Sequence, residues 1–192
     1  PFAAPLRLRA VSGDGASVAA SLRVFNEPGS GTYGLSFPVA AAGESVLAAG
    51  ERGLLFAPPD RGAERLNVSL FAPFEASEAE VELLAAGGAV LRSIPVSLPA
   101  LRRTQLDDLL AGSPAAVSVR VRVGAGRVQA WGTAISNSPT NDPWRVPALP
   151  LAAASRSWSV PAVASAPGRN GAFFTSDLFL HAPAGAALDA TL

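Results

Sequence analysis

The sequence predicts an all-β protein, and three observations carry that prediction. Apolar and polar residues alternate over short runs, as they do in half-buried strands. The 18 glycines and 17 prolines separate these runs at close intervals, which is typical of turns between antiparallel strands. Strand-like segments also recur at a spacing of about 110 residues, which indicates repeated modules.

Three hairpins and one helix are expected along the chain. In residues 117–123 arginines alternate with valines, which predicts a strand with one polar face and one buried face. Residues 104–110 are the expected helix, because Thr104 and Asp107 resemble a capping box and three leucines share a helical face. The expected hairpins cover residues 6–25 with a turn at 12–15, residues 81–96 with a turn at 85–88, and residues 117–135 with a turn at 124–126.

The repeat rests on pairs of matching segments. Residues 18–25 match residues 128–135, and residues 65–73 match residues 176–183, where both copies end in Ala-Pro. Between these segments, Phe37-Pro38 matches Val146-Pro147. The matches keep the same order and nearly the same offset, so we interpret them as copies of one module.

This register predicts one complete module and one split module. Residues 38–147 form the complete module, whereas residues 1–37 and 148–192 are the closing and opening parts of the second. Turn signals every 8–12 residues or so favour a two-sheet, immunoglobulin-like antiparallel β-sandwich for each module. The chain begins with Pro1 and has no Met, so a trimmed secreted protein or a slice of a longer array is expected.

The two parts of the split module are complementary, so they are expected to join. They can pair within one chain, or the tail of one chain can meet the head of the next and form a homopolymer. The candidate assembly strands carry the apolar residues Leu6, Leu8, Val11, Leu22, Val24, Phe173, Leu178, Leu180, Leu188 and Leu192.

Four motifs lie at residues 31–34, 49–55, 66–70 and 134–143. They resemble signatures of a module repeated in large secreted bacterial proteins. The last motif departs from the usual pattern at Ser136, where an Asp is expected, and this weakens any metal interpretation. The resemblance implies extracellular β-sandwich arrays and supplies no catalytic residues.

Little in the sequence favours catalysis or a bound metal. His181 is the only histidine, and its counterpart in the complete module is Phe71, so a triad would exist in one copy only. Asp107 and Asp108 are adjacent, which suits the polar side of a connection better than paired acid–base work. The absence of cysteine excludes thiolate sites. Calcium remains an alternative to ordinary turn bonding for the oxygens of Asn137, Thr140, Asn141 and Asp142.

Three tryptophans raise the alternative of a glycan surface. Trp144 and Trp158 follow turn segments and are the candidate glycan contacts, whereas Trp131 lies mid-strand and is expected in the core. The acidic run formed by Glu75, Glu78, Glu80 and Glu82 predicts a solvated strand face or a protected sheet edge.

These patterns predict a non-enzymatic, extracellular structural protein without cofactors. We expect a filament or surface-array subunit that is held together by β-strand complementation. The alternative is a glycan-binding or adhesive accessory module of a larger secreted protein. Nucleic acid is not an expected partner at a formal net charge of +0, and no apolar run is long enough to span a membrane.

Overall fold

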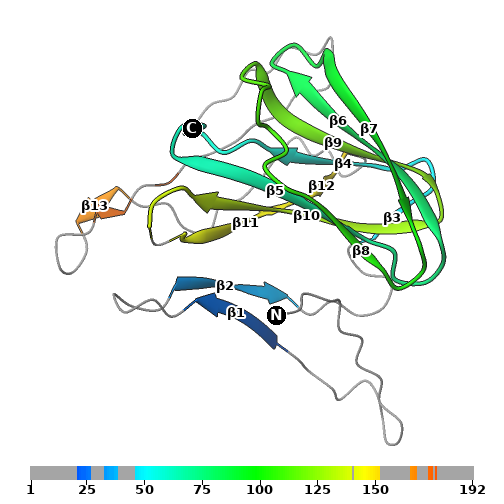
Figure 1. Ribbon diagram of the computed structural model, residues 1–192, viewed down its shortest axis with the longest axis horizontal. Helices are drawn as coiled ribbons and strands as arrows, with labels where there is room; N and C mark the ends of the chain where they lie inside the picture. Colours follow the sequence, from blue (N-terminus) through cyan, green and yellow to red (C-terminus); the bar gives the residue numbers. More distant parts are fainter. Residues whose placement is uncertain are drawn as a thin grey trace, which may run out of the picture. The chain divides into compact units, whose positions relative to one another are not determined.

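The computed structural model describes residues 21–26, 33–38, 46–139, 141–151, 165–167, 173–174 and 176. The chain divides into two compact units, Pro1–Ala152 and Ala153–Leu192, and each is described by itself. The elements formed by the described residues are all β-strands, and they pair antiparallel (Figure 1). The predicted all-β class is therefore confirmed.

Five strands of the first unit form one antiparallel sheet. They are β3 (Leu47–Ala48), β5 (Glu64–Phe71), β8 (Arg103–Leu106), β10 (Arg127–Ser136) and β11 (Pro143–Pro147). Their order is β11-β10-β5-β8, and β3 pairs with the start of β10.

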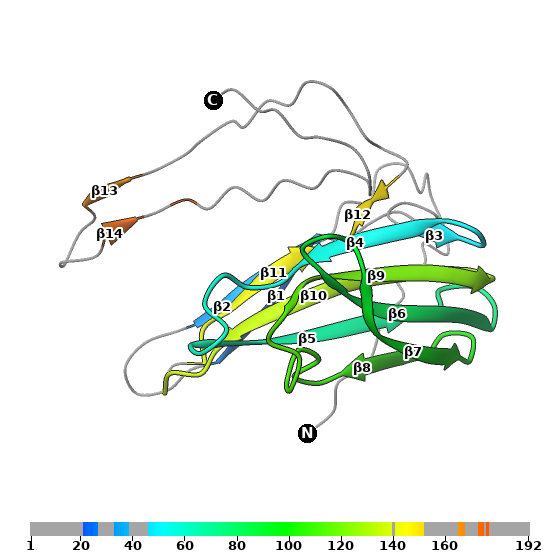
Figure 2. The same cartoon turned by 90° about the horizontal axis from the view of Figure 1, so that it is seen from above.

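Five further strands form a second antiparallel sheet in the same unit (Figure 2). They are β4 (Arg52–Phe56), β6 (Ser77–Ala85), β7 (Val90–Leu98), β9 (Ala116–Ala125) and β12 (Leu149–Pro150), in the order β12-β4-β9-β6-β7. The expected hairpin over residues 81–96 is confirmed as β6–β7, and Gly88 in its turn has a φ of 79°. That positive φ suits a residue without a Cβ atom.

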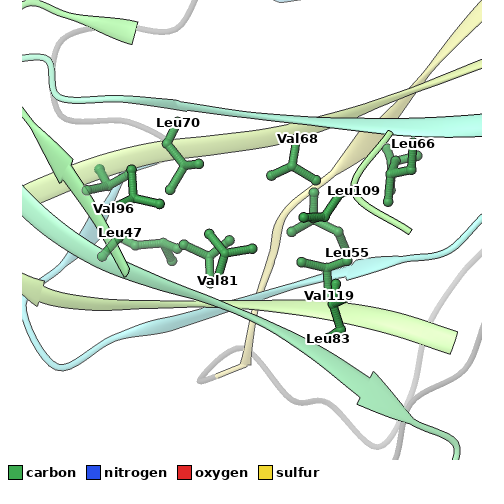
Figure 3. Packing of buried hydrophobic residues seen from close by; sticks show 14 of the residues in the cluster. Leu47, Leu55, Leu66, Val68, Leu70, Val81, Leu83, Val96, Leu109 and Val119 are labelled. Atoms are coloured by element: carbon green, nitrogen blue, oxygen red, sulfur yellow. The ribbon is translucent and has the colours of Figure 1, made fainter. Parts of the chain in front are cut away.

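An apolar core fills the space between these two sheets and makes the arrangement sandwich-like. Figure 3 shows Val68 and Leu70 of β5 pointing toward Leu55 of β4 and Val81 of β6, and all four are fully buried. In β9 the valines at 119, 121 and 123 are buried, whereas Arg120 and Arg122 lie on the other face. The predicted alternation is confirmed over residues 119–123, whereas Val117 is exposed and Ser118 is buried beside a register shift between β6 and β9.

Two short hairpins lie outside these sheets. In the first unit β1 (Ser21–Asn26) pairs with β2 (Tyr33–Pro38), drawn in blue in Figure 1. In the second unit β13 (Ala166–Pro167) pairs with β14 (Phe173–Phe174). Most of the expected hairpin over residues 6–25 lies outside the described residues.

The expected hairpin over residues 117–135 is wrong, because its two strands belong to different sheets. β9 pairs with β4 and β6, whereas β10 pairs with β5 and β11. Gly126 makes the corner between them at a φ of 71°. A Cβ atom there would overlap Ser77 Oγ and lie 2.9 Å from the carbonyl oxygen of Ala76, so the corner requires glycine.

The expected helix over residues 104–110 is also wrong. Residues 103–106 form β8, in which Thr104 pairs with Leu70 and Leu106 with Val68. The chain then turns at Asp108, whose φ is 41°, and the Leu109 amide donates to the Leu66 carbonyl at 2.8 Å. The leucine spacing reflects a strand end and a turn that both face the core, rather than one helical face.

Candidate functional site

The β1–β2 hairpin has one face that is apolar and exposed. Leu22 and Val24 alternate with Arg23 and Phe25, so the two pairs lie on opposite faces of β1. Leu22 is 45% exposed and Val24 is 52% exposed. We call Leu22 and Val24 the apolar face of β1. On the other face, the Arg23 guanidinium lies 5.2 Å from the centre of the Phe25 ring.

This hairpin has the same pairing register as the hairpin formed by β10 and β11. In β1–β2 Leu22 lies opposite Phe37, and Val24 lies opposite Leu35. The matching residues of the other hairpin, Gly132 with Val146 and Ala134 with Trp144, pair in the same way. The sequence repeat therefore extends to the hydrogen-bonded register of the two hairpins.

The matching face of β10 is closed by the core. Ala134 is fully buried, and a Cβ atom on Gly132 would lie 3.0 Å from Leu66 and 3.2 Å from Leu55 of the opposite sheet. The larger side chains of Leu22 and Val24 occupy these same positions in β1. The apolar face of β1 thus corresponds to a surface that a complete sandwich covers.

The direction of the backbone amides identifies the edge of β1 that a further strand would use. In β10 the Ser136 amide donates to Asp142 at 3.0 Å, toward β11, and the next amide, of Asn137, donates to Ala63 at 2.7 Å, on the β5 side. Amide direction alternates along a strand. By the shared register, the Arg23 and Phe25 amides point away from β2, toward what we call the outer edge of β1.

Within the described residues β1 pairs with β2 alone. In the first five-stranded sheet the corresponding side of β10 is filled by β5, over eight residue pairs from Gln129–Phe71 to Ser136–Glu64. The outer edge of β1 therefore corresponds to the edge of β10 that pairs with β5.

Three of the four edge strands of the two five-stranded sheets, β7, β11 and β12, carry prolines, whereas the edge strand β8 carries none. Pro95 lies within β7, an edge strand of nine residues, and Pro143 and Pro147 bound the edge strand β11. Pro150 belongs to β12. A proline has no amide hydrogen to donate, so these edges are poor templates for another strand.

Most of the predicted assembly residues lie outside the described residues. This holds for Leu6, Leu8, Val11, Leu178, Leu180, Leu188 and Leu192. The backbone of Phe173 lies in β14, opposite Pro167. Leu22 and Val24 are the predicted assembly residues whose side chains the structure describes.

Glu80 and Glu82 of the acidic run lie in β6 and form ion pairs with β9. β6 lies between β7 and β9, so the edge interpretation is wrong. Glu82 Oε2 lies 2.5 Å from Arg120 Nε, and Glu80 is paired with Arg122 and accepts from Ser93. The Ser93 hydrogen bond and then Arg122 lower the pKa of Glu80.

A further ion pair holds the chain beside the Gly126 corner. Arg127 donates through Nε and Nη2 to the two carboxylate oxygens of Glu75, at 3.0 and 3.1 Å. This hydrogen bonding lowers the pKa of Glu75 and raises that of Arg127. Glu75, Glu80 and Glu82 therefore form ion pairs that hold the structure together.

The tryptophans differ from the sequence-based expectations. Trp144 is partly buried against the core, and its Nε1 donates to Glu64 Oε1 at 2.6 Å. Trp131 was expected in the core, and this is wrong: it alternates with the buried Gly132 and lies on the outer face of β10, where it is partly exposed. Trp158 lies outside the described residues.

The loop considered for calcium is held by an arginine. Arg65 Nη1 donates to Asn137 Oδ1 at 2.9 Å, and Arg65 Nη2 donates to Asn141 Oδ1 at 3.1 Å. Two of the oxygens that a cation would need therefore already bind a positive charge. Asp142 lies beside them in the loop, and Thr140 lies outside the described residues.

A hollow of about 250 Å³ is lined by charged side chains at one end of the first unit. Arg61 in its wall donates to the carbonyl oxygens of Leu110 at 3.2 Å and Ser113 at 3.1 Å, and burial lowers its pKa. Arg65 and Glu64, also in the wall, bind Asn137 and Trp144 as described above. These charged groups hold the loops around the hollow in place.

The described part of the chain contains no group of three His, Asp or Glu side chains that could hold a metal ion. His181 lies outside it. No helix among the described residues is long and apolar enough to cross a membrane.

Comparisons with known protein families, with curated proteins and with solved structures found no match for this chain. The resemblance to secreted repeat modules therefore rests on its four sequence motifs alone.

Proposed function

We propose that this chain is a non-enzymatic, extracellular structural protein that assembles head to tail by β-strand complementation. In this proposal β1–β2 is the closing hairpin of an immunoglobulin-like sandwich. The part of residues 148–192 that follows β12 supplies the opening strands from a neighbouring subunit. The single observation that carries the proposal is the exposure of Leu22 and Val24 at positions that are buried in the matching hairpin.

Burial supplies the driving force in this proposal. Covering the apolar face of β1 removes apolar area from water, and strand addition pairs the amides of Arg23 and Phe25 with new carbonyl groups. The contact joins two different surfaces of the subunit, so it need not close into a ring and can propagate into a filament.

The edges of the two five-stranded sheets support the same proposal. Pro95, Pro143 and Pro147 leave gaps in the donors that a lateral neighbour would need. Pairing at the outer edge of β1 is then favoured over pairing at β7 or β11. Trp144 gives less support to the alternative of glycan binding, since it packs against the core and its indole N–H is bound to Glu64.

Deleting residues 173–192 tests the proposal. The truncated chain keeps β1–β2 and both five-stranded sheets but loses the end of the opening segment. We expect monomers in sedimentation velocity and no filaments in negative-stain electron microscopy, with an unchanged β-sheet signal in circular dichroism. Filaments that persist in the truncated chain would contradict the proposal.

A mixing experiment sharpens this test. The truncated chain retains the acceptor edge of β1 but lacks the donor segment, so it should bind one end of a growing filament and stop it. Adding it to the full chain should shorten the filaments as its mole fraction rises. Unchanged filament lengths at a high mole fraction would argue against a head-to-tail contact.

A further inference from the structure

We propose that residues 174–183 of a second copy of this chain add to the outer edge of β1, with Leu22 opposite Leu178 and Arg23 opposite Asp177. This inference rests on the proposed function and deepens it, because it names the strand and its register. The docking surface is the outer edge of β1 together with its apolar face.

The register follows from the complete sandwich. There Gly132 pairs with Val68, and Thr133 pairs with Asn67. The repeat of about 110 residues places Leu22 and Arg23 at the first members of these pairs. The same spacing places Leu178 and Asp177 at the second members, because residues 176–183 repeat residues 66–73.

The chemistry of both pairs suits this register. Leu178 would cover Leu22 on the side that faces the core in the matching hairpin. On the other face, Asp177 would lie opposite Arg23, and opposite charges directly across two strands attract. The matching positions of the complete sandwich hold the neutral pair of Thr133 and Asn67, so this charge pair belongs to the split module alone.

The backbone geometry makes one pair suitable for a disulfide. The odd-numbered amides of β10 point toward β5, so Gly132 and Val68 form a non-hydrogen-bonded pair. Cα atoms in such pairs lie about 4.5 Å apart, within the range of about 4.4–6.8 Å that disulfides bridge. Leu180, two residues further along, would lie diagonally at about 7–8 Å, beyond that range.

Cysteine cross-linking tests the register without background, because the chain contains no cysteine. We expect a Leu22→Cys and Leu178→Cys pair to oxidise almost completely in the assembled protein. The Leu22→Cys and Leu180→Cys pair should react at least about tenfold more slowly, since its disulfide would be strained. Equal rates for the two pairs, or a faster control pair, would overturn the register.

Single-cysteine variants separate this inference from the proposed function. When the Leu22→Cys chain is mixed with the Leu178→Cys chain, pairing between chains gives a covalent dimer that reduction splits. If only the double variant cross-links, and only within one chain, the register stands but head-to-tail assembly fails. If filaments form without a cross-link between positions 22 and 178, assembly stands and this inference fails.

A charge exchange gives a second readout that needs no cysteine. Arg23→Asp or Asp177→Arg alone should lower the concentration of assembled protein, because each places like charges opposite one another. The double variant should restore assembly toward the original level. Failure of the double variant to recover, with folded subunits by circular dichroism, would contradict the pairing of these two residues.

Discussion

Placing charges on the apolar face of β1 should weaken assembly without disturbing the subunit. The perturbation is the double variant Leu22→Asp, Val24→Asp. Burying a Leu or Val side chain completely contributes about 1.5–3 kcal/mol. Leu22 and Val24 are 45% and 52% exposed, so about half of that remains to be gained on assembly for each.

The two residues together should therefore contribute about 1.5–3 kcal/mol to association. At about 1.4 kcal/mol for each factor of ten, the double variant should raise the dissociation constant by about 10- to 140-fold. Burying the new carboxylates would add to this loss. Sedimentation velocity over a series of concentrations measures the change.

The chain offers a closely matched control. Val90 and Leu91 in β7 are 48% and 46% exposed, and they lie on an edge strand that the proposed contact does not use. Val90→Asp, Leu91→Asp should leave the dissociation constant within about threefold of the original value. Equal weakening by both double variants, or no weakening by the β1 variant, would refute the reasoning.

Three further predictions concern the subunit itself. Gly126→Ala should lower the free energy of unfolding in urea by about 3–5 kcal/mol, because of the positive φ and the loss of the Ser77 hydrogen bonds. Gly112→Ala, at a φ of 70° in open space, should lower it by only about 1–2 kcal/mol. Equal losses in the two variants would contradict the tight corner at Gly126. Glu75→Gln should lower the free energy of unfolding at neutral pH. The difference between the two proteins should shrink below about pH 4, because Glu75, whose pKa is lowered in the folded state, becomes protonated there and loses its stabilising contribution. A difference that stays constant down to about pH 3 would argue against the ion pair with Arg127. Pro95→Thr should restore a backbone amide donor at the edge strand β7 and produce lateral oligomers, which light scattering detects. An unchanged light-scattering profile would show that Pro95 does not protect this edge.

The sequence predicted well where local pattern decides the structure. The alternation of residues 117–123 identified a half-buried strand, and the glycines at 87 and 88 identified the β6–β7 turn. These features depend on side-chain period and turn chemistry, both of which are visible within a short window.

Sequence reasoning failed where distant strands decide the structure. A hairpin within one sheet and a crossing from one sheet to the other have the same sequence pattern, which is a strand, a glycine turn and a second strand. Only the pairing of β9 with β4 and β6 shows that Gly126 is a crossing. Trp131 was assigned to the wrong face of β10 for a related reason. The small residues Gly132 and Ala134 face the core, so the odd-numbered Trp131 faces outward despite the size of its indole ring.

The candidate site was only partly visible in the sequence. The repeat predicts Leu22 and Val24 as assembly residues, and the structure adds that their matching positions in β10 are buried. Sequence reasoning missed Arg23 and the role of Pro95. The signal for Arg23 was present in the repeat, from which we propose the pairing with Asp177, whereas the position of Pro95 at a sheet edge required knowing that β7 is an edge strand.

Hydrogen exchange at the outer edge of β1 tests the central claim most directly. In the assembled full chain the amides of Arg23 and Phe25 should exchange slowly, like those of Leu22 and Val24, which point toward β2. In the chain lacking residues 173–192, the Arg23 and Phe25 amides should exchange fast while those of Leu22 and Val24 keep more protection. Fast exchange of Arg23 and Phe25 in both proteins would contradict strand complementation at this edge.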